Sequence, residues 1–421
     1  MAETRKWMPR WLVTLLALAA AWGAGHVTLP GVDRNMLEQV VRAAGRARLT
    51  GFEQLSVVAL GLMPALSGFV LVELAALIVP RWRPLRTGGP EGRASLRVSA
   101  VTVTLGLAAI QGWFVAVWLE SFSWRYGMYG ELVRDPGLSS RLVITVTLIA
   151  GTCLMLALAW LIDRHGLGSG FAVMIASAAL PYAFDLGEHA YLGVEQGMMD
   201  LTDVIALLLR LGIIGLGTWW ILTVHRRASP GGALRHPTSG ALPIATAASL
   251  LFLPVQLANL GLNIGGILPQ PGTSTYNYAN AILIALLCAG FSWLFFRDAR
   301  GTRKWWEGIG RSAAFLVGVA VVTSRARSAL DGAVVIVAVA VAMDLAAEWR
   351  AREKFGELVA VWPVHQVARL DEHLARLAAA NIPVLARGEH YRTLLHFFGP
   401  YAPIDLMVPA ARAADARKAL E

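Results

Sequence analysis

Residues 59 to 80 read ALGLMPALSGFVLVELAALIVP, an almost unbroken apolar run that contains one acidic residue, Glu73. A helix needs about 20 mainly apolar residues to cross the ~30 Å hydrocarbon layer of a membrane, and this run is long enough. Pro64 interrupts it near its start, which fits a locally broken helix, although proline is also tolerated in ordinary membrane helices. The run therefore predicts a membrane-spanning helix.

The composition of the whole chain agrees with this prediction. Of 421 residues, 56% are hydrophobic and 15% are charged, with a mean hydropathy of +0.55. These values exclude a soluble enzyme with a single core. The net charge of +9 could suggest nucleic-acid binding, but it is also expected where Lys and Arg cluster in cytoplasmic loops, so we expect a lipid bilayer and no DNA as partner. Because Cys153 and Cys288 both lie in apolar runs, we expect neither a disulfide framework nor a cysteine metal site.

Apolar runs of similar character recur along the chain and predict ten membrane helices. The fifth and ninth runs are short, so their helices are expected to be tilted, partly re-entrant or sheltered by neighbours. The ten runs cover residues 11–29, 55–79, 98–120, 142–162, 170–184, 202–224, 241–260, 277–296, 311–323 and 331–348.

The distribution of basic residues predicts the orientation. The N-terminal segment and every second loop after it carry 16 Lys and Arg, against 9 in the opposite loops. Both termini are therefore expected in the cytoplasm. We expect the protein in the inner (plasma) membrane of the cell. A second interpretation stays open: residues 11–29 could be a cleaved signal peptide, because Arg5, Lys6 and Arg10 precede an apolar stretch with small residues. Cleavage would leave nine helices.

From Trp349 onward the apolar runs become short and charges frequent. Strand-like runs at 358–362, 382–386 and 404–408 alternate with a helix bearing Leu370, Leu374 and Leu377 on one face and with an Ala-rich final helix. We therefore predict two domains: an all-α membrane domain over 1–355 and a small cytoplasmic α+β module over 356–421.

Several short motifs occur together in a specific order. The second apolar run holds the 59–68 motif quoted above, and four further landmarks follow the order of a known family. They are Leu29–Asp33 after the first helix, Gly151–Thr152 with Arg164–Gly170 after the fourth, Gly240–Pro243 with Ala247–Pro254, and Gly332 with Val341–Asp344 in the tenth. Over roughly residues 10–355 the chain resembles SecY, the protein-conducting channel of the Sec translocon.

This resemblance implies a two-half bundle of ten helices that forms a channel for protein translocation or membrane insertion, with no enzymatic activity and no cofactor. It also implies a SecE-like small membrane subunit, an unfolded polypeptide substrate, and a partner that supplies the energy. A narrow apolar collar holds back ions by dewetting and binds no particular sequence. Carried over position by position, the collar falls on Leu62, Leu66, Phe171, Ile175, Ala245 and Val337, although Phe171 is bulky and Ala245 small.

The resemblance assigns two further features. Residues 32–52 correspond to a plug beneath the collar, although an exposed amphipathic loop explains them equally well. Residues 62–79 and 242–258 correspond to the helices that line a lateral gate toward lipid.

Charged residues inside apolar runs are hints of function because their burial in lipid is costly. Glu73, Arg210, Asp344 and Glu348 are of this kind. We interpret Asp344 and Glu348 as helix-end residues in contact with water, and we expect Arg210 to snorkel or to pair within the bundle. A relay through such residues would suit a transporter.

Two cytoplasmic loops depart from the SecY pattern because they are short, about 226–240 and 297–310, and the second lacks a Gly-x-Arg-Pro-Gly stretch. A SecA-type motor or a ribosome as partner is therefore in doubt. The basic residues of these loops are candidate contacts for acidic RNA or protein, but arginines that orient the protein in the membrane would look the same. These residues are Arg226, Arg227, Arg297, Arg300, Arg303 and Lys304.

The sequence holds no pattern typical of catalysis. Gly166-x-Gly168-x-Gly170 lacks the preceding strand and following Lys-Ser/Thr of a phosphate cradle, so we predict a tight turn there. The histidines show no His-Glu-x-x-His spacing, which predicts no metal site. The alternative function is that of a SecY-derived protein that no longer translocates and instead transports a small solute or relays a signal through its C-terminal module.

Overall fold

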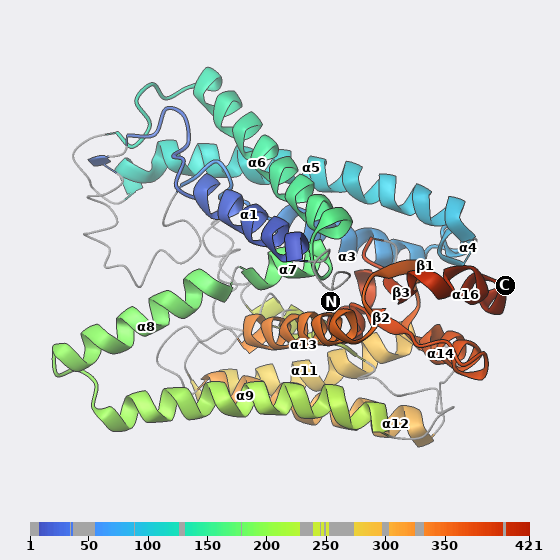
Figure 1. Cartoon of the computed structure of the whole chain (residues 1–421). Coiled ribbons are helices and arrows are strands. Elements are labelled where there is room, and N and C mark those ends of the chain that lie inside the picture. The colour runs from blue at the N-terminus through green and yellow to red at the C-terminus, as the bar shows by residue number, and fades with distance from the viewer. Residues whose placement is uncertain are drawn as a thin grey trace. The chain divides into compact units, whose positions relative to one another are not determined.

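The protein is described here from a computed structural model, in which the chain forms two compact units, Trp7–Met174 and Ile175–Glu421 (Figure 1). The predicted domain boundary at residues 355 and 356 lies inside the second unit and stays a prediction. The residues described are 8–33, 35–36, 55–87, 89–125, 131–177, 179–227, 239–244, 246–247, 250–251, 273–296, 303–324, 332–398 and 401–421.

In the first unit, long apolar helices pack side by side. Helix α3 packs along α5, α5 along α6, and α1 along α6. Ala108 and Leu119 of α5 and Ile144 and Leu148 of α6 are fully buried in the core cluster of this unit. The helices are α1 (Met8–Ala24), α3 (Met63–Ile78), α4 (Arg83–Thr87), α5 (Gly89–Arg125) and α6 (Leu138–His165), and α7 (Gly170–Ser177) begins here.

The glycine-rich stretch after α6 forms the predicted turn. The N–H of Leu167 donates to Oγ1 of Thr14 in α1 over 2.8 Å, and the N–H of Gly170 donates to Oδ1 of Asp163 over 2.6 Å. Gly168 has φ +78°, a conformation that glycine adopts without strain. The backbone amides of Leu167 and Gly170 are therefore satisfied by the protein itself.

In the second unit, α13 packs on α9, α11 on α12, and α12 on α9. Buried residues recur along one face of α13 from Gly332 to Arg352, so this helix has a continuous interior stripe. The helices are α8 (Ala179–Glu195), α9 (Leu201–Arg227), α11 (Ser274–Phe295), α12 (Arg303–Ser324) and α13 (Gly332–Phe355).

Six described helices are long and apolar enough to cross a membrane, and two shorter apolar helices, Pro9–Ala24 and Met63–Ile78, accompany them. The chain is therefore a mostly helical membrane protein. The second predicted span begins later than expected, because residues 57–62 form turns before α3. The fifth falls on two helices, α7 and α8, and most of the seventh, 241–260, lies outside the described residues. The six long helices are Glu91–Ser121, Leu138–His165, Leu201–Thr223, Ser274–Phe295, Trp305–Thr323 and Gly332–Phe355.

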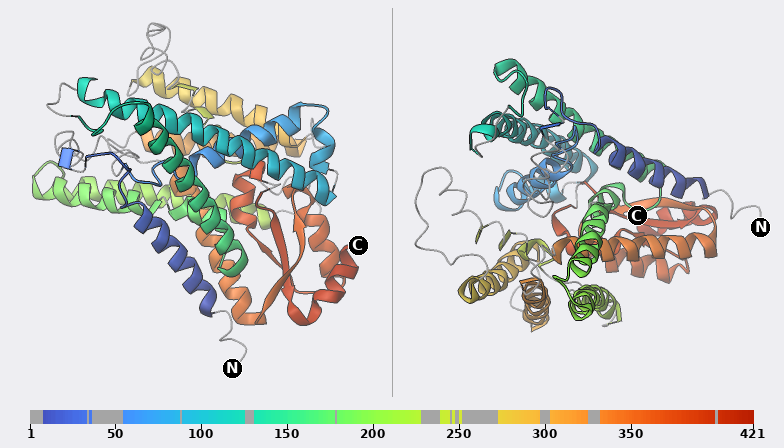
Figure 2. Two further views of the ribbon diagram at one scale, coloured as in Figure 1. Left: turned by 90° about the horizontal axis from the view of Figure 1, so that it is seen from above. Right: turned by 90° about the vertical axis from the view of Figure 1, so that its left-hand side faces the viewer.

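The C-terminal segment, residues 356–421, holds a three-stranded antiparallel sheet in the order β1-β3-β2 (Figure 2). All three strands overlap the predicted runs. Leu370 and Leu377 of α14 pack with the buried side chains of β3 and α16 in one apolar cluster, so helices cover one face of the sheet. The elements are β1 (Leu358–Val364), α14 (Leu370–Ala379), β2 (Leu385–Arg387), α15 (Glu389–Leu394), β3 (Ile404–Pro409) and α16 (Ala413–Leu420), with 3-10 turns at Val367–Arg369, His396–Phe398 and Ala410–Arg412.

Candidate functional site

Three of the six predicted collar residues belong to the first unit. Leu62, immediately before α3, and Phe171 in α7 are buried, and Leu66 is half-buried. The ring of Phe171 lies 5.1 Å from the ring of Phe69, so the bulky side chain packs against α3. Other α3 side chains, such as Leu71, are exposed. The predicted positions therefore avoid the exposed face of this helix.

The other described collar residues lie in the second unit. Ile175 is half-buried in α7, and Val337 belongs to the buried stripe of α13. Ala245 lies outside the described residues, as do residues 37–54 of the predicted plug. Convergence of these positions on one constriction stays a prediction.

Glu73, the acidic residue of the quoted run, forms an ion pair with an arginine 13 positions later. Arg86 of α4 donates from Nε to Oε1 of Glu73 over 2.5 Å, and the Glu73 side chain is only 1% exposed. Arg83 donates to the carbonyl oxygens of Leu77 and Ile78, the last residues of α3. Two arginines after the turn thus fix the C-terminal end of α3, which gives Glu73 a structural role.

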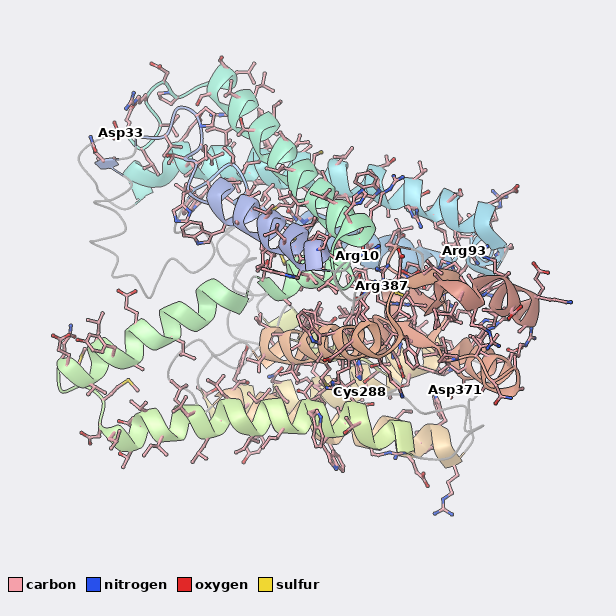
Figure 3. The ribbon with its side chains drawn as sticks, in the orientation of Figure 1. Arg10, Asp33, Arg93, Cys288, Asp371 and Arg387 are labelled. Carbon is pink, nitrogen blue, oxygen red and sulfur yellow. The ribbon has the colours of Figure 1, made fainter. Side chains whose placement is uncertain are left out.

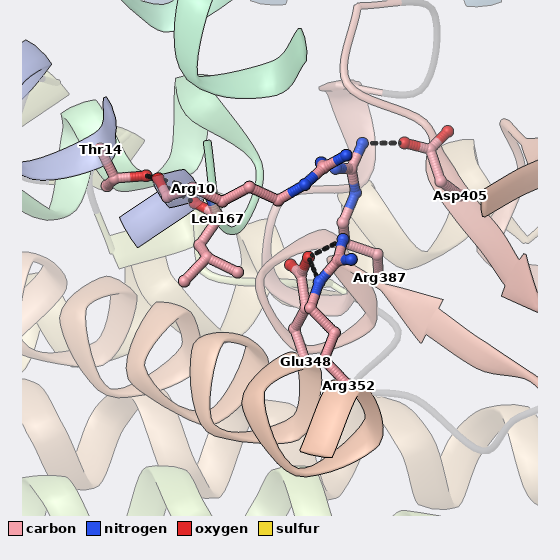
Figure 4. A network of polar contacts seen from close by, with 7 residues as sticks. All are labelled: Arg10, Thr14, Leu167, Glu348, Arg352, Arg387 and Asp405. Atoms are coloured by element: carbon pink, nitrogen blue, oxygen red, sulfur yellow. Dashed lines mark hydrogen bonds and ion pairs between the residues drawn. The ribbon is translucent and has the colours of Figure 1, made fainter. Parts of the chain in front are cut away.

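The interpretation of Asp344 and Glu348 as residues in contact with water is wrong, because both side chains are buried in α13. Glu348 accepts two hydrogen bonds from Arg352 one turn later, Nε at 2.8 Å and Nη2 at 2.7 Å, and this pair is almost fully excluded from solvent (Figure 4). Close by, Arg387 of β2, labelled in Figure 3, is paired with Asp405 of β3 at 2.5 Å (Figure 4). The folded C-terminal segment excludes the water that the sequence led us to expect.

Asp344 makes the most specific contact of α13 with the C-terminal segment. Its Oδ1 accepts the backbone N–H of His390, and its Oδ2 accepts that of Tyr391, both at 3.0 Å. The Nδ1 atom of His390 lies 2.6 Å from Oδ1. These amides belong to the first turn of α15 and have no partner within their own helix. The Asp344 carboxylate therefore caps this helix end from a position 46 residues before His390.

The other end of α15 contacts the start of the seventh apolar run. The carbonyl oxygen of Leu394 accepts the N–H of Ala241 over 2.7 Å. Gly240 has φ +63°, and a Cβ there would lie 2.2 Å from the same carbonyl oxygen. Only glycine allows this approach.

Aromatic and basic side chains complete the contact. The ring of His396 lies 5.5 Å from Phe295 and 5.3 Å from Phe296, at the end of α11. Arg392 is fully buried and donates to the carbonyl oxygens of Leu395, His365 and His396. The residues around α15 therefore form one polar and aromatic network in the second unit.

The predicted cytoplasmic contacts are only partly described. Arg303 is 93% exposed and pairs with Glu307 at 2.9 Å, so its guanidinium is accessible. Arg226 and Arg227 end α9, Lys304 lies in the first turn of α12, and Arg297 and Arg300 lie outside the described residues. Arg210 is half-buried in α9, and no described acidic residue forms an ion pair with it. Within the described ranges, no group of three or more His, Cys, Asp or Glu could hold a metal ion.

The six long apolar helices define the class of a polytopic helical membrane protein. Comparison with known proteins defines the family. The SecY family profile matches residues 56–357. The chain belongs to the SecY family.

Individual relatives agree. The protein translocase subunit SecY of Streptomyces coelicolor is 26% identical over 276 residues, which cover 57% of this chain and 62% of that protein. The SecY subunit of Aquifex aeolicus is 23% identical over 347 residues, covering 75% and 80%. Among solved structures, Sec61 in the canine ribosome-channel complex from the endoplasmic reticulum has a similar fold, with a TM-score of 0.52 and 13% identity over 82% of this chain and 92% of that one.

Proposed function

We propose that this chain is the channel-forming subunit of a protein translocase and moves unfolded polypeptides across or into a cell inner membrane. The observation that carries the proposal is the SecY match over residues 56–357, which includes all the collar positions. The chain needs no catalytic chemistry and no cofactor for this task, since a partner supplies the energy.

The proposed pore constriction is the apolar collar of Leu62, Leu66, Phe171, Ile175, Ala245 and Val337. Apolar side chains at a narrow point exclude water and ions, yet they make no bonds that a passing chain would have to break. Support comes from the burial of Leu62, Phe171 and Val337, since α3, directly after Leu62, and α13, which holds Val337, also carry exposed apolar side chains. Residues 32–52 are the proposed plug, and 62–79 with 242–258 are the proposed lateral gate.

The proposed topology has ten membrane helices, both termini in the cytoplasm, and a cytoplasmic C-terminal module over 356–421. The 16 to 9 distribution of basic residues between alternate loops supports the orientation. A SecE-like small subunit is the proposed membrane partner. The exposed side chain of Arg303 supports its place, with Arg226, Arg227, Arg297, Arg300 and Lys304, on the proposed contact surface for a cytoplasmic partner.

Photo-crosslinking tests this function. A photoreactive amino acid at Leu66 or Val337 should form adducts with a secretory polypeptide stalled during translocation. Each position has a matched control five residues along the same helix, Leu71 and Ala342, because five residues rotate a helical side chain by about 140°. Both control side chains are exposed. Adducts at the control positions alone, or at none while a known channel yields them in parallel, would contradict the proposal.

A second candidate is a SecY-derived protein that no longer translocates and instead carries a small solute or a signal. The short loops at 226–240 and 297–310 favour it, since they leave little surface for a motor or ribosome. Under this candidate, no polypeptide adduct would form at Leu66 or Val337.

A further inference from the structure

The C-terminal segment touches two different membrane elements of the second unit through one short helix. All six residues of α15 are buried. Asp344 of α13 binds its N-terminal amides, and Ala241 binds its last carbonyl oxygen. We call the described residues 239–244, 246–247 and 250–251, which include the start of the seventh apolar run, the Ser239 segment. Helix α15 thus bridges α13 and the Ser239 segment.

The bonds at both ends depend on position. At one end, Oδ1 and Oδ2 of Asp344 each accept one backbone N–H over 3.0 Å, so the carboxylate must lie in front of both amides at once. At the other, the approach of Leu394 to Gly240 leaves no room for a side chain. An apolar cover could slide along its surface, but these bonds break when either partner moves by a few ångströms.

Helix α15 cannot easily move independently of the sheet beside it. Arg392 in its middle ties it to the carbonyl oxygens of His365, after β1, and of Leu395 and His396. Gly388, with φ +80°, turns the chain directly from β2 into α15. A displacement of α15 must therefore involve the whole C-terminal segment.

General electrostatic attraction does not explain the contact. Residues 357–421 carry seven basic and seven acidic side chains and so have no net charge. The specific buried bonds at α15 and the aromatic contacts of His396 with Phe295 and Phe296 must hold the segment in place.

We infer that the C-terminal segment is a latch: through α15 it locks the Ser239 segment to α13, and its release permits these two membrane elements to move apart. The consequence for transport rests on the proposed function, in which the Ser239 segment overlaps the lateral gate at 242–258. The mechanical part of the inference does not depend on it.

Amide hydrogen exchange in the full-length protein, reconstituted in lipid nanodiscs, tests the latch. Asp344→Asn weakens the first end of α15 and Gly240→Ala the second. If α15 couples the two elements, Asp344→Asn should raise exchange about tenfold in the peptide containing Ala241 as well as at His390 and Tyr391. Gly240→Ala should raise exchange at His390 and Tyr391 as well as in the peptide containing Ala241. Glu372→Gln is the control, because it removes an exposed ion pair with Arg376 in the same segment and should change neither end.

Asp344→Asn or Gly240→Ala could unfold the C-terminal segment, so a variant that strengthens the contact is also needed. Ala241 and Leu394 are joined by a backbone hydrogen bond, so cysteines at these positions should be close enough to bridge, directly or with a short reagent. Closing the bridge should slow exchange at His390 and Tyr391. Changes confined to the altered end in all three variants would overturn the latch.

A transport measurement separates the latch from the proposed function. The bridged protein should pass polypeptide at least tenfold more slowly than its reduced form, with recovery on reduction. Coupled exchange with equal passage in both forms would overturn the gating role of the latch. Coupled exchange with no polypeptide adducts at Leu66 or Val337 would leave the latch standing and contradict the translocase function.

Discussion

The sequence draws attention to the charged side chains within the apolar helices, but it does not show what these side chains contact. Glu73, Asp344 and Glu348 attract attention because carboxylates are costly in an apolar environment. Their partners Arg86, His390 and Arg352 were not identified. Arg352, one helical turn after Glu348, could have been found by its i,i+4 spacing. His390 could not, since no local pattern joins it to a residue 46 positions earlier.

The pair of Glu73 and Arg86 leads to an asymmetric prediction. Arg86→Gln should destabilise the first unit by about 3 kcal/mol, because it leaves a buried carboxylate without its cation. Glu73→Gln should cost only about 1 kcal/mol, since the Arg86 side chain is 20% exposed and can reach water. Unfolding midpoints of the purified protein in detergent measure both. Arg303→Ala, which removes a solvent-screened pair, should leave the midpoint unchanged, and equal losses for the two Glu73–Arg86 variants would refute the asymmetry.

His373 gives the C-terminal segment a pH-dependent stability. Burial lowers the pKa of its imidazole below the usual 6.5, although neighbouring Glu372 opposes the shift. Its ring lies 6.0 Å from that of Trp362, and no described residue forms a hydrogen bond with its Nδ1. The unfolded imidazole therefore binds a proton more readily than the folded one, so the free energy of unfolding falls as the pH drops below about 6.5.

Exchange protection factors of residues 357–421, corrected for the intrinsic pH dependence of exchange, measure this effect. Protection should be lower at pH 5.5 than at pH 7.5. In His373→Phe, whose ring still packs on Trp362, the difference should shrink. A pH dependence identical to that of the parent protein would show that His373 does not cause it.

At the scale of elements, the prediction from sequence succeeded where one pattern dominates. The hydropathy of 98–120, 142–162 and 202–224 located α5, α6 and α9, because a lipid-facing helix must be apolar over its length. The strand-like apolar runs at 358–362 and 404–408 located β1 and β3. The start of α3 was placed too early, since the apolar residues 57–62 fit a buried turn as well as a helix.

Close contact between elements in the first unit depends on Gly151. A Cβ at this position of α6 would lie 1.8 Å from the carbonyl oxygen of Val57, in the turns before α3. Gly151→Ala should therefore separate α6 from this turn and lower stability by about 2–3 kcal/mol. Gly106 of α5 has no atom near the place where its Cβ would lie, so Gly106→Ala should be neutral or stabilise by up to about 1 kcal/mol. Thermal unfolding in detergent compares them, and equal effects would contradict this reading.

At the scale of the whole molecule, the family and the class of protein could be predicted because five motifs occur in the family's order. The attachment of the C-terminal segment to α13 and to Ala241 could not. It depends on backbone groups of α15, and backbone atoms carry no sequence signal. Gly240 is a family landmark in the sequence, but only the structure shows its positive φ and its contact with Leu394.

The central claim of the proposed function is that a translocating polypeptide passes the collar residues. Its most direct test is a double crosslink: cysteines replace Leu66 and Val337 in one channel, and a stalled secretory chain carries two neighbouring cysteines. We predict a single product in which one polypeptide is joined to both positions, at a yield well above that of the control pair at Leu71 and Ala342. A product joined to only one position, or equal yields for the two pairs, would contradict the account.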